Sequence, residues 1–190
     1  MLDAFIAAVA SRGYEGLTLR SVAVETGMSP ARLSYHFGTK KKLFLAALAH
    51  VEDRASAGVE GSMKGARSHW QRVSKVISWS LPVGVGDPEW QIWLAAFDQA
   101  PYDPEIAAVL ALSSRRYKRQ LAGAIQAGAD AGEFRVRSAL ETATVASATL
   151  DGLAIECVAG VPGVTRSRVR ALVLGLLRRE LGLAGEDHRG

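Results

Sequence analysis

The chain has 190 residues, 48% of them hydrophobic and 22% charged, and a formal net charge of +4. These ordinary globular values exclude a disordered, collagen-like or coiled-coil chain. Every apolar stretch is broken by Arg, Glu, Asp or Gly before the ~18 residues that a membrane helix needs, so we expect no membrane span. The single cysteine, Cys157, excludes internal disulfides and multi-cysteine metal sites and fits a reducing compartment. Asp3 stands where a secretion signal would carry bases, so we expect a cytoplasmic protein.

Apolar residues recur at helical spacing from the start of the chain. The first helix is expected to end at Gly13, because glycine commonly follows the last turn. Thr18 is the expected N-cap of a second helix that runs to about Thr26. Ser29 caps a third helix, with Pro30 in its first position, where the missing N–H removes no hydrogen bond.

A fourth helix is expected from Thr39 through Val51. The Gly-, Ser- and Ala-rich segment Ala55–Ala66 is predicted to be a boundary or a frayed turn. No stretch alternates with the period of a β-strand. The chain is therefore predicted to be all-α with about nine helices, the last five at about 67–81, 89–99, 104–131, 138–158 and 165–181.

Two short helices joined by a turn at Gly27 have the sequence form of a helix-turn-helix. Residues 1–50 hold six bases against three acids, whereas residues 51–190 hold 17 bases against 16 acids. This asymmetry suggests a polyanionic partner, although a solvated basic face also explains it. The second helix of such a pair can enter the ~12 Å major groove of DNA.

The candidate DNA contacts follow from their chemistry and place. Arg32 lies on the first turn of the third helix, where it can make a bidentate pair with guanine. Tyr35, His36 and Lys40 cluster at the end of that helix, within reach of phosphates, although His36 could instead be a core or capping histidine. Six apolar residues are assigned to the mini-core: Leu19, Val22, Ala23, Met28, Leu33 and Phe37.

This segment resembles the DNA-binding domain of the TetR family of bacterial repressors over roughly residues 2–48. The resemblance is carried by Gly13-Tyr14, Thr18-Leu19-Arg20-Ser21-Val22-Ala23, Gly27-Met28-Ser29, Leu33-Ser34-Tyr35-His36-Phe37, Lys40 and Leu43. It implies a homodimer that binds a near-palindromic operator in double-stranded DNA and is released by a small-molecule effector. The DNA-binding residues are then expected to be Thr18, Arg20, Ser29, Pro30, Ala31, Arg32, Ser34, Tyr35, His36 and Lys40.

Two features depart from the family pattern. The family usually has Tyr directly after the leucine of the third helix, where this chain has Ser34, so we expect Tyr35 to take over part of that role. The family also usually has a basic arm before the first helix, whereas this chain starts at Met1-Leu2. Either the arm contacts are missing or the native start lies upstream.

Aromatic residues concentrate on the fifth to seventh helices. Stripes of this kind form plain core as often as they contact a ligand, but as a group they suggest an aromatic-walled effector pocket. We expect that pocket to be lined by Trp79, Trp90, Trp93, Phe97 and Tyr117.

The last two helices, residues 138–158 and 165–181, are rich in small and aliphatic residues on more than one stripe. This indicates burial beyond the core of one chain, so we expect them to form a homodimer interface, in preference to a wholly intramolecular core.

The C-terminal part also resembles the choline-responsive repressors of the betaine operon within the same family. Trp90-Gln91-Ile92-Trp93, Ser113-Ser114-Arg115-Arg116 and Ala148-Thr149-Leu150-Asp151-Gly152-Leu153 carry this looser match. Acids at Asp98, Asp151 and Glu156 beside aromatic walls would suit a cation. Capping or paired surface acids are the interpretation that the sequence favours for them.

The sequence predicts a regulator and no enzyme. It holds no nucleophile elbow, phosphate-binding loop, zinc-binding helix or Cys/His ligand set, so no catalytic residue, cofactor or metal site is expected. A helical protein at a membrane surface is a weaker alternative, because the bases lie around short capped helices. We expect a DNA-binding domain at 1–48, an effector and dimerisation domain at 49–185, and a disordered tail at 186–190.

Overall fold

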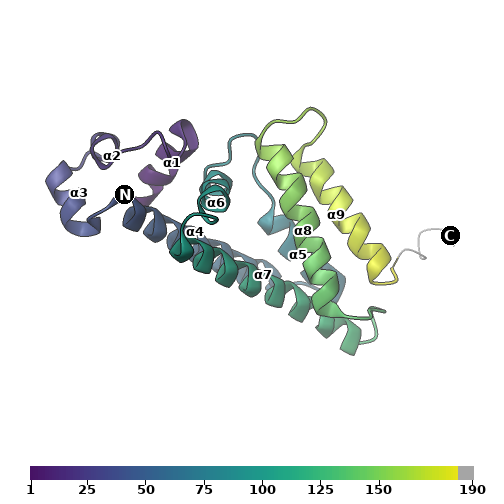
Figure 1. Ribbon diagram of the computed structural model, residues 1–190. Helices are drawn as coiled ribbons and strands as arrows, with labels where there is room; N and C mark the ends of the chain where they lie inside the picture. The colour runs from purple at the N-terminus through teal and green to yellow at the C-terminus, as the bar shows by residue number, and fades with distance from the viewer. Residues whose placement is uncertain (184–190) are drawn as a thin grey trace. The chain divides into compact units, whose positions relative to one another are not determined.

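The computed structural model describes residues 1–183, and within them it contains nine α-helices and no strand (Figure 1). This confirms the all-α prediction. The tail expected at 186–190 lies outside the described residues. The helices are α1 (Leu2–Arg12), α2 (Leu19–Thr26), α3 (Pro30–Phe37), α4 (Lys40–Met63), α5 (His69–Ser80), α6 (Pro88–Gln99), α7 (Pro104–Asp130), α8 (Ala139–Val158) and α9 (Arg166–Glu180).

The chain divides into two compact units. The first unit contains residues 1–54 and 85–113, and the second contains residues 55–84 and the described chain from 114 onward. The helices α4 and α7 each begin in the first unit and end in the second. The division into compact units therefore places α6 with the N-terminal helices. The expected domain boundary at residue 48 instead divides the chain by sequence order, with α6 in the C-terminal part.

The prediction of a frayed turn at Ala55–Ala66 is wrong, because α4 continues without a break to Met63. The alternative of a boundary agrees with the division of the chain into two units, which falls between Arg54 and Ala55. Tertiary packing overrides the small-residue composition there. Val59 and Ser56 are buried, and the Ser56 hydroxyl accepts a hydrogen bond from Gln120 Nε2 at 3.1 Å. Gly58 lies under the indole of Trp79, so a glycine that looks like a helix breaker makes room for a large side chain.

One hydrophobic core holds the first unit together. It joins α1 to α6 and includes the fully buried side chains of Phe5, Leu33, Phe44 and Ile92. Every residue assigned to the mini-core from the sequence either belongs to this core or packs against it. The short α2 and α3 are thus fixed on a framework formed by α1, α4 and α6.

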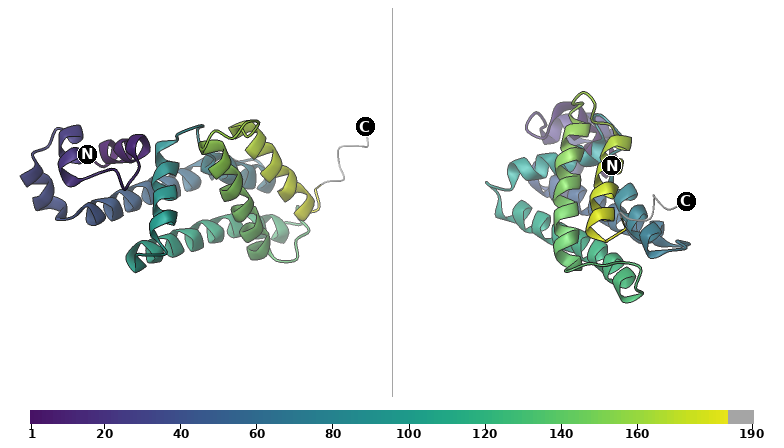
Figure 2. Two further views of the ribbon diagram at one scale, coloured as in Figure 1. Left: turned by 45° about the horizontal axis from the view of Figure 1, so that its top comes forward. Right: turned by 90° about the vertical axis from the view of Figure 1, so that its right-hand side faces the viewer.

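The second unit is built around α8 and α9, which lie side by side (Figure 2). Arg166, on α9, donates hydrogen bonds to the carbonyls of Ser78, Leu81 and Pro82, and so caps the C-terminal end of α5. Ser138 accepts a hydrogen bond from the N–H of Glu141 and so caps the start of α8. Among residues 1–183, no helix is long and apolar enough to cross a membrane.

Candidate nucleic-acid interface and effector site

The helix α3 is anchored by one face and open on the others. Leu33 is completely buried and Phe37 packs against the core, while the remaining side chains of α3 are exposed. Tyr35 is 87% exposed, although an aromatic side chain in a folded protein is usually covered. His36 is exposed beside the Tyr35 ring, so it is not the core histidine that the sequence left open. This geometry leaves α3 free to enter a groove.

Side-chain caps fix the N-terminal ends of both helices. At α2, Thr18 Oγ1 accepts from the N–H of Ser21 at 3.1 Å, and Ser21 Oγ accepts from the N–H of Thr18 at 3.0 Å. At α3, Ser29 Oγ accepts from the N–H of Arg32 at 3.2 Å, and Pro30 occupies the first turn. The positive ends of both helix dipoles therefore face solvent, where an anion such as phosphate can bind.

The structure brings the sequence-predicted DNA contacts together in the first unit. Thr18 and Arg20 lie at the start of α2, and all residues predicted on or next to α3 are exposed. Lys40 is the most constrained: its Nζ donates to the carbonyl of Tyr14 at 3.2 Å and lies 4.2 Å from the centre of the Tyr14 ring. These contacts hold the ammonium group at the start of α4, directly after the exposed helix.

A network of charged side chains, which the sequence did not reveal, connects α1, α4 and α6. Arg54 on α4 forms salt bridges with Asp3 on α1, at 2.8 Å, and with Glu89 on α6. His50 Nε2 lies 3.3 Å from Asp3 Oδ1. Its hydrogen bond lowers the pKa of Asp3 most, and the charge of Arg54 lowers it further. The partners stand 35 to 51 positions apart in the chain, so no local pattern could indicate them.

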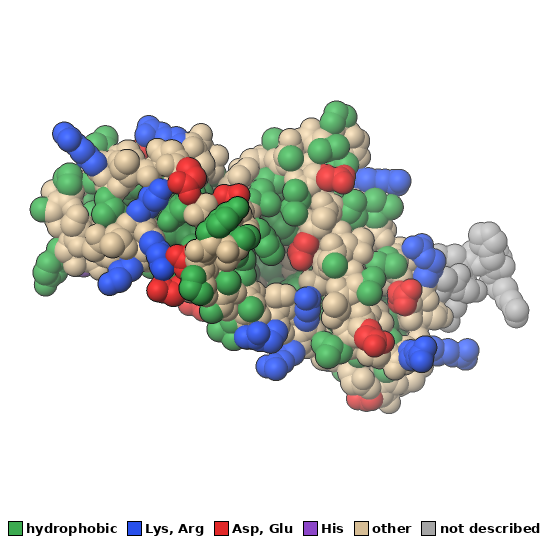
Figure 3. All heavy atoms as spheres, in the orientation of Figure 1, with side chains coloured by type: hydrophobic (Ala, Val, Ile, Leu, Met, Phe, Trp, Pro, Cys, Tyr) green, Lys and Arg blue, Asp and Glu red, His purple; other side chains and the backbone are tan. Residues whose placement is uncertain are grey.

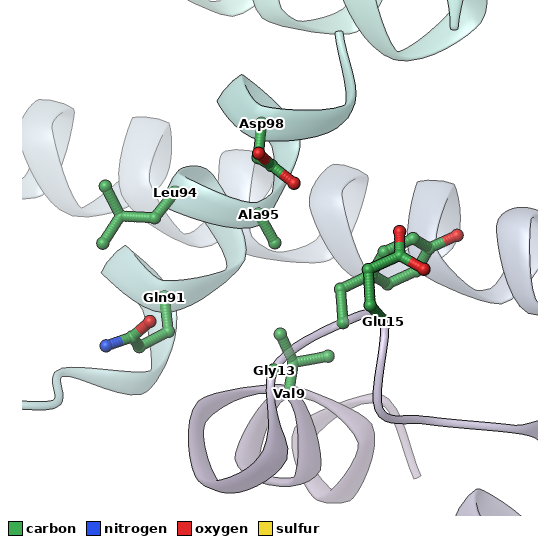
Figure 4. Close-up of a pocket in the computed structure, with 8 residues that line it drawn as sticks. Val9, Gly13, Glu15, Gln91, Leu94, Ala95 and Asp98 are labelled. Atoms are coloured by element: carbon green, nitrogen blue, oxygen red, sulfur yellow. The ribbon is translucent and has the colours of Figure 1, made fainter. Parts of the chain in front are cut away.

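A groove of about 300 Å³ also lies between α1 and α6 (Figure 4). One wall is formed by the end of α1 and the turn after it, and the other by α6. Carboxylates at Glu15 and Asp98 line it together with apolar side chains. Asp98 accepts a hydrogen bond from Gln99 Nε2, which fits the surface acid that the sequence favoured. The groove lies along the contact between α1 and α6, and through this contact α6 supports the DNA-binding helices.

The aromatic residues predicted for an effector pocket are divided between the two units. Trp90, Trp93 and Phe97 lie on α6 in the first unit, where Trp93 packs against the hydrophobic core and Phe97 is half exposed. Trp79 and Tyr117 lie in the second unit. The role of all five in ligand binding therefore remains a prediction.

The indole of Trp79 packs directly against the helix α4 at Gly58. A Cβ added at Gly58 would overlap Cε2, Cζ2 and Nε1 of the indole, so the ring lies directly on the glycine. The same ring is half exposed. It can thus face a ligand while it contacts the helix that starts next to the DNA-binding segment.

Tyr117, on α7, has a buried hydroxyl with no hydrogen-bond partner within the described part of the chain. Burial raises its pKa above the ordinary value of 10.0, and the charge of Asp151 raises it further. Ser80 acts in the opposite direction, but its own hydroxyl donates to the carbonyl of Val76 at 3.0 Å. An unsatisfied buried hydroxyl costs about 1–3 kcal/mol, so this one requires an explanation.

Asp151, on α8, is neither the capping acid nor the paired surface acid that the sequence favoured. Its side chain is partly buried, and Lys118 is the charged group that acts on the carboxylate. Burial raises its pKa to about 6, and Lys118 offsets this only in part. The sequence signal was an acid within an apolar helix, but its partial burial becomes visible only in the fold.

The outer faces of α8 and α9 expose large apolar side chains, and hydrophobic side chains lie on their visible face in Figure 3. Leu140, Val145 and Ile155 on α8 and Leu172 on α9 are each 39% exposed or more. A monomer rarely leaves such a face uncovered. Among residues 1–183, no cluster of three or more possible metal ligands occurs.

Family models match both parts of the chain. Residues 2–47 match the model described as bacterial regulatory proteins of the tetR family. Residues 70–182 match the model of the C-terminal domain of BetI-type transcriptional repressors.

Curated relatives and solved structures agree with these matches. The HTH-type transcriptional regulator BetI of Rhizobium meliloti (strain 1021) is 28% identical over 156 residues, which cover 82% of this chain and 74% of that protein. The BetI regulator of Brucella canis is 28% identical over 175 residues, 91% of this chain and 85% of that protein. A transcriptional regulator from Saccharomonospora viridis, solved in complex with choline, has a TM-score of 0.88 and 27% identity, covering 95% of this chain and 94% of that chain.

A TetR-family regulator from Rhodococcus sp. has a TM-score of 0.79 at 27% identity, with 95% of each chain covered. The likeness thus extends over both units and includes the exposed α3 and the apolar α8 and α9. The chain belongs to the TetR family of bacterial regulatory proteins, among those with a BetI-type C-terminal domain, and is a transcriptional regulator rather than an enzyme.

Proposed function

We propose that this protein is a dimeric repressor that binds a near-palindromic operator through α2 and α3 and releases it when a small organic cation binds to its C-terminal part. The observation that carries the DNA-binding half is the helix α3, which is buried at Leu33 and exposed around the rest of its surface. A protein that binds chromosomal DNA in a bacterium acts in the cytoplasm, so we place it there.

The exposed residues divide into two kinds of contact. Arg32 stands on the first turn of α3 and is proposed to read a guanine through its two parallel N–H donors. Thr18, Ser29, Tyr35, His36 and Lys40 are proposed to bind phosphates, because they surround the two helix N-termini or the end of α3. Arg20, Pro30, Ala31 and Ser34 complete the contact surface.

The dimer is proposed to form through residues 138–158 and 165–181. The exposed apolar side chains of α8 and α9 supply the surface that a partner chain would cover. A two-fold dimer places two copies of α3 on one face of the DNA, as a near-palindromic site requires.

The proposal of an organic cation as effector is supported by the choline found in the Saccharomonospora viridis regulator. Trp79, Trp90, Trp93, Phe97 and Tyr117 remain the proposed aromatic contacts, since aromatic faces attract cations.

The test is selection of duplex fragments by the purified protein, followed by fluorescence anisotropy on the enriched sequence. Arg32→Ala should weaken binding to that sequence by about 1–3 kcal/mol and leave random DNA nearly unaffected. Equal loss on both duplexes would make Arg32 a phosphate contact, and failure of the wild type to enrich any sequence would refute the operator.

A further inference from the structure

The groove between α1 and α6 lies entirely within the first unit and has no part in the contacts assigned to DNA or to the effector. Its volume of about 300 Å³ is at the lower end of the range of small-molecule sites. Val9 of α1 and Leu94 and Ala95 of α6 form its apolar part, and Glu15 and Asp98 contribute one carboxylate from each wall (Figure 4). Among residues 1–183, no Lys or Arg lines the groove. Its chemistry is therefore apolar with two negative charges.

The two carboxylates have weaker partners than other acids of the same unit. Glu15 Oε2 lies 4.0 Å from Lys40 Nζ, and Asp98 accepts a hydrogen bond from a neutral amide at 2.9 Å. By contrast, Asp3 and Asp103 each lie 2.8 Å from a basic nitrogen. Glu15 and Asp98 are both exposed, so their oxygens can accept further hydrogen bonds from a bound molecule.

We propose that this groove is a second ligand site, which binds an aliphatic diamine with one ammonium group at Glu15 and the other at Asp98. The methylene chain of the ligand then packs against the apolar side chains of the groove. Each primary ammonium group supplies a positive charge and three N–H donors, which is what a carboxylate binds best. A ligand with two charged ends serves both walls at once.

Other ligand classes fit the groove less well. An anion would be repelled by both carboxylates. A lysine side chain of another protein, or a cation with a single charge, would leave one of the two carboxylates without a counter-ion. A metal ion would need further ligands, and residues 1–183 contain no group of three or more that could hold one.

The site is connected to the DNA-binding surface through Glu15. The carboxylate of Glu15 is the acid next to Lys40, which is proposed to bind a phosphate. An ammonium group bound to Glu15 adds positive charge at this place, and a polyanion is then attracted more strongly. A diamine should therefore raise operator affinity, the opposite of the effector. This step rests on the proposed function, whereas binding of the diamine does not.

The test measures binding by isothermal titration calorimetry of the whole protein at about pH 7.5. The probes are linear diamines with three to six methylene groups, with pentylamine as the ligand that carries one ammonium group. Glu15→Gln and Asp98→Asn are the test variants. Asp53→Asn is the matched control, because Asp53 is an exposed acid on α4 in the same unit and does not line the groove.

The variants should lower the affinity for diamines in particular. The best diamine should bind the wild type several-fold more tightly than pentylamine does. Glu15→Gln and Asp98→Asn should each weaken that diamine about two- to fivefold, as expected for the loss of one exposed ion pair, and bring it close to pentylamine. Pentylamine should change less, because each variant keeps one carboxylate. Asp53→Asn should match the wild type with every probe.

Fluorescence anisotropy on the selected operator tests the connection to DNA. The diamine should raise the operator affinity of the wild type by up to about fivefold, the size expected for one exposed charge pair. Glu15→Gln without ligand should raise it in the same direction, because it removes the negative charge beside Lys40. The double variant Glu15→Gln/Asp98→Asn should not respond to the diamine, and so corrects for diamine that binds to the DNA itself.

The outcomes separate the inference from the proposed function. Equal wild-type affinity for diamines and pentylamine, unchanged diamine affinity in variants that circular dichroism shows to be folded, or displacement of the diamine by choline would overturn the second site. Operator affinity that does not rise with bound diamine would overturn its connection to Lys40. Failure of the wild type to bind any operator would instead overturn the proposed function and leave the calorimetric result intact.

Discussion

Asp151→Asn is expected to stabilise the ligand-free protein at neutral pH. Burial raises the pKa of Asp151 from 3.8 to about 6, so the native state holds that proton more tightly than the unfolded chain does. The native carboxylate is therefore unfavourable at neutral pH, and the unfolded chain, in which it is hydrated, gains relative stability.

The expected gain in the free energy of unfolding follows from the size of the Asp151 pKa shift. Each pKa unit corresponds to 1.36 kcal/mol, so a shift of about two units corresponds to at most about 3 kcal/mol at pH 7. Asn keeps a polar amide at the same place, so we expect a gain of about 1–3 kcal/mol. For a chain of this size that corresponds to about 2–4 °C in Tm for each kcal/mol.

The direction of the Asp151 pKa shift also determines the pH range in which the variant differs from the wild type in stability. The penalty is absent below about pH 4, grows as the pH rises through about 6, and is complete above that value. The free energy of unfolding of wild type and Asp151→Asn is therefore measured by urea denaturation from about pH 4 to pH 8. The control variant is Asp130→Asn, because Asp130 is an exposed acid on α7 that accepts a hydrogen bond from Gln126. The Asp151→Asn curve should separate from the other two only above about pH 4, and lower stability of this variant at neutral pH would refute the reasoning.

Three further predictions follow from the described contacts. Gly58→Ala must displace the Trp79 indole, so the tryptophan emission should shift and choline affinity should fall several-fold, whereas Gly61→Ala, which meets no neighbouring atom, should change neither. Lys40→Ala should reduce the salt slope of DNA binding by ~1, and Lys42→Ala, at an exposed lysine, should reduce it less; equal slopes would remove Lys40 from the phosphate contacts. Ile155→Arg should shift the protein from dimer to monomer in analytical ultracentrifugation, because it places a charge on the exposed apolar face of α8, and an unchanged dimer would move the interface elsewhere.

Local sequence signals predicted the helices well, because capping residues and glycines near the ends of the helices mark where they begin and end. The sequence predicts Thr18 and Ser29 as caps, and each accepts a backbone N–H in the structure. The resemblance in the first 48 residues placed the DNA-binding segment for the same reason: its glycines, caps and apolar positions are all local.

Features that depend on distant residues were missed. The segment after Val51 looked like a break because its glycines and serines resemble a loop, yet packing against Gln120 and Trp79 keeps it helical. The salt bridges of Arg54 join three helices and leave no periodic trace in the sequence. The partial burial of Asp151, which raises its pKa, depends on how α8 packs, and no spacing pattern in the sequence indicates it.

The account is tested most directly by one linkage measurement. The affinity of the selected operator is measured by fluorescence anisotropy with and without saturating choline, and the affinity of choline is measured with and without saturating operator. The account predicts that choline weakens operator binding ~5–150-fold and that the operator weakens choline binding by the same factor. Operator affinity that is unchanged or raised by choline would contradict it.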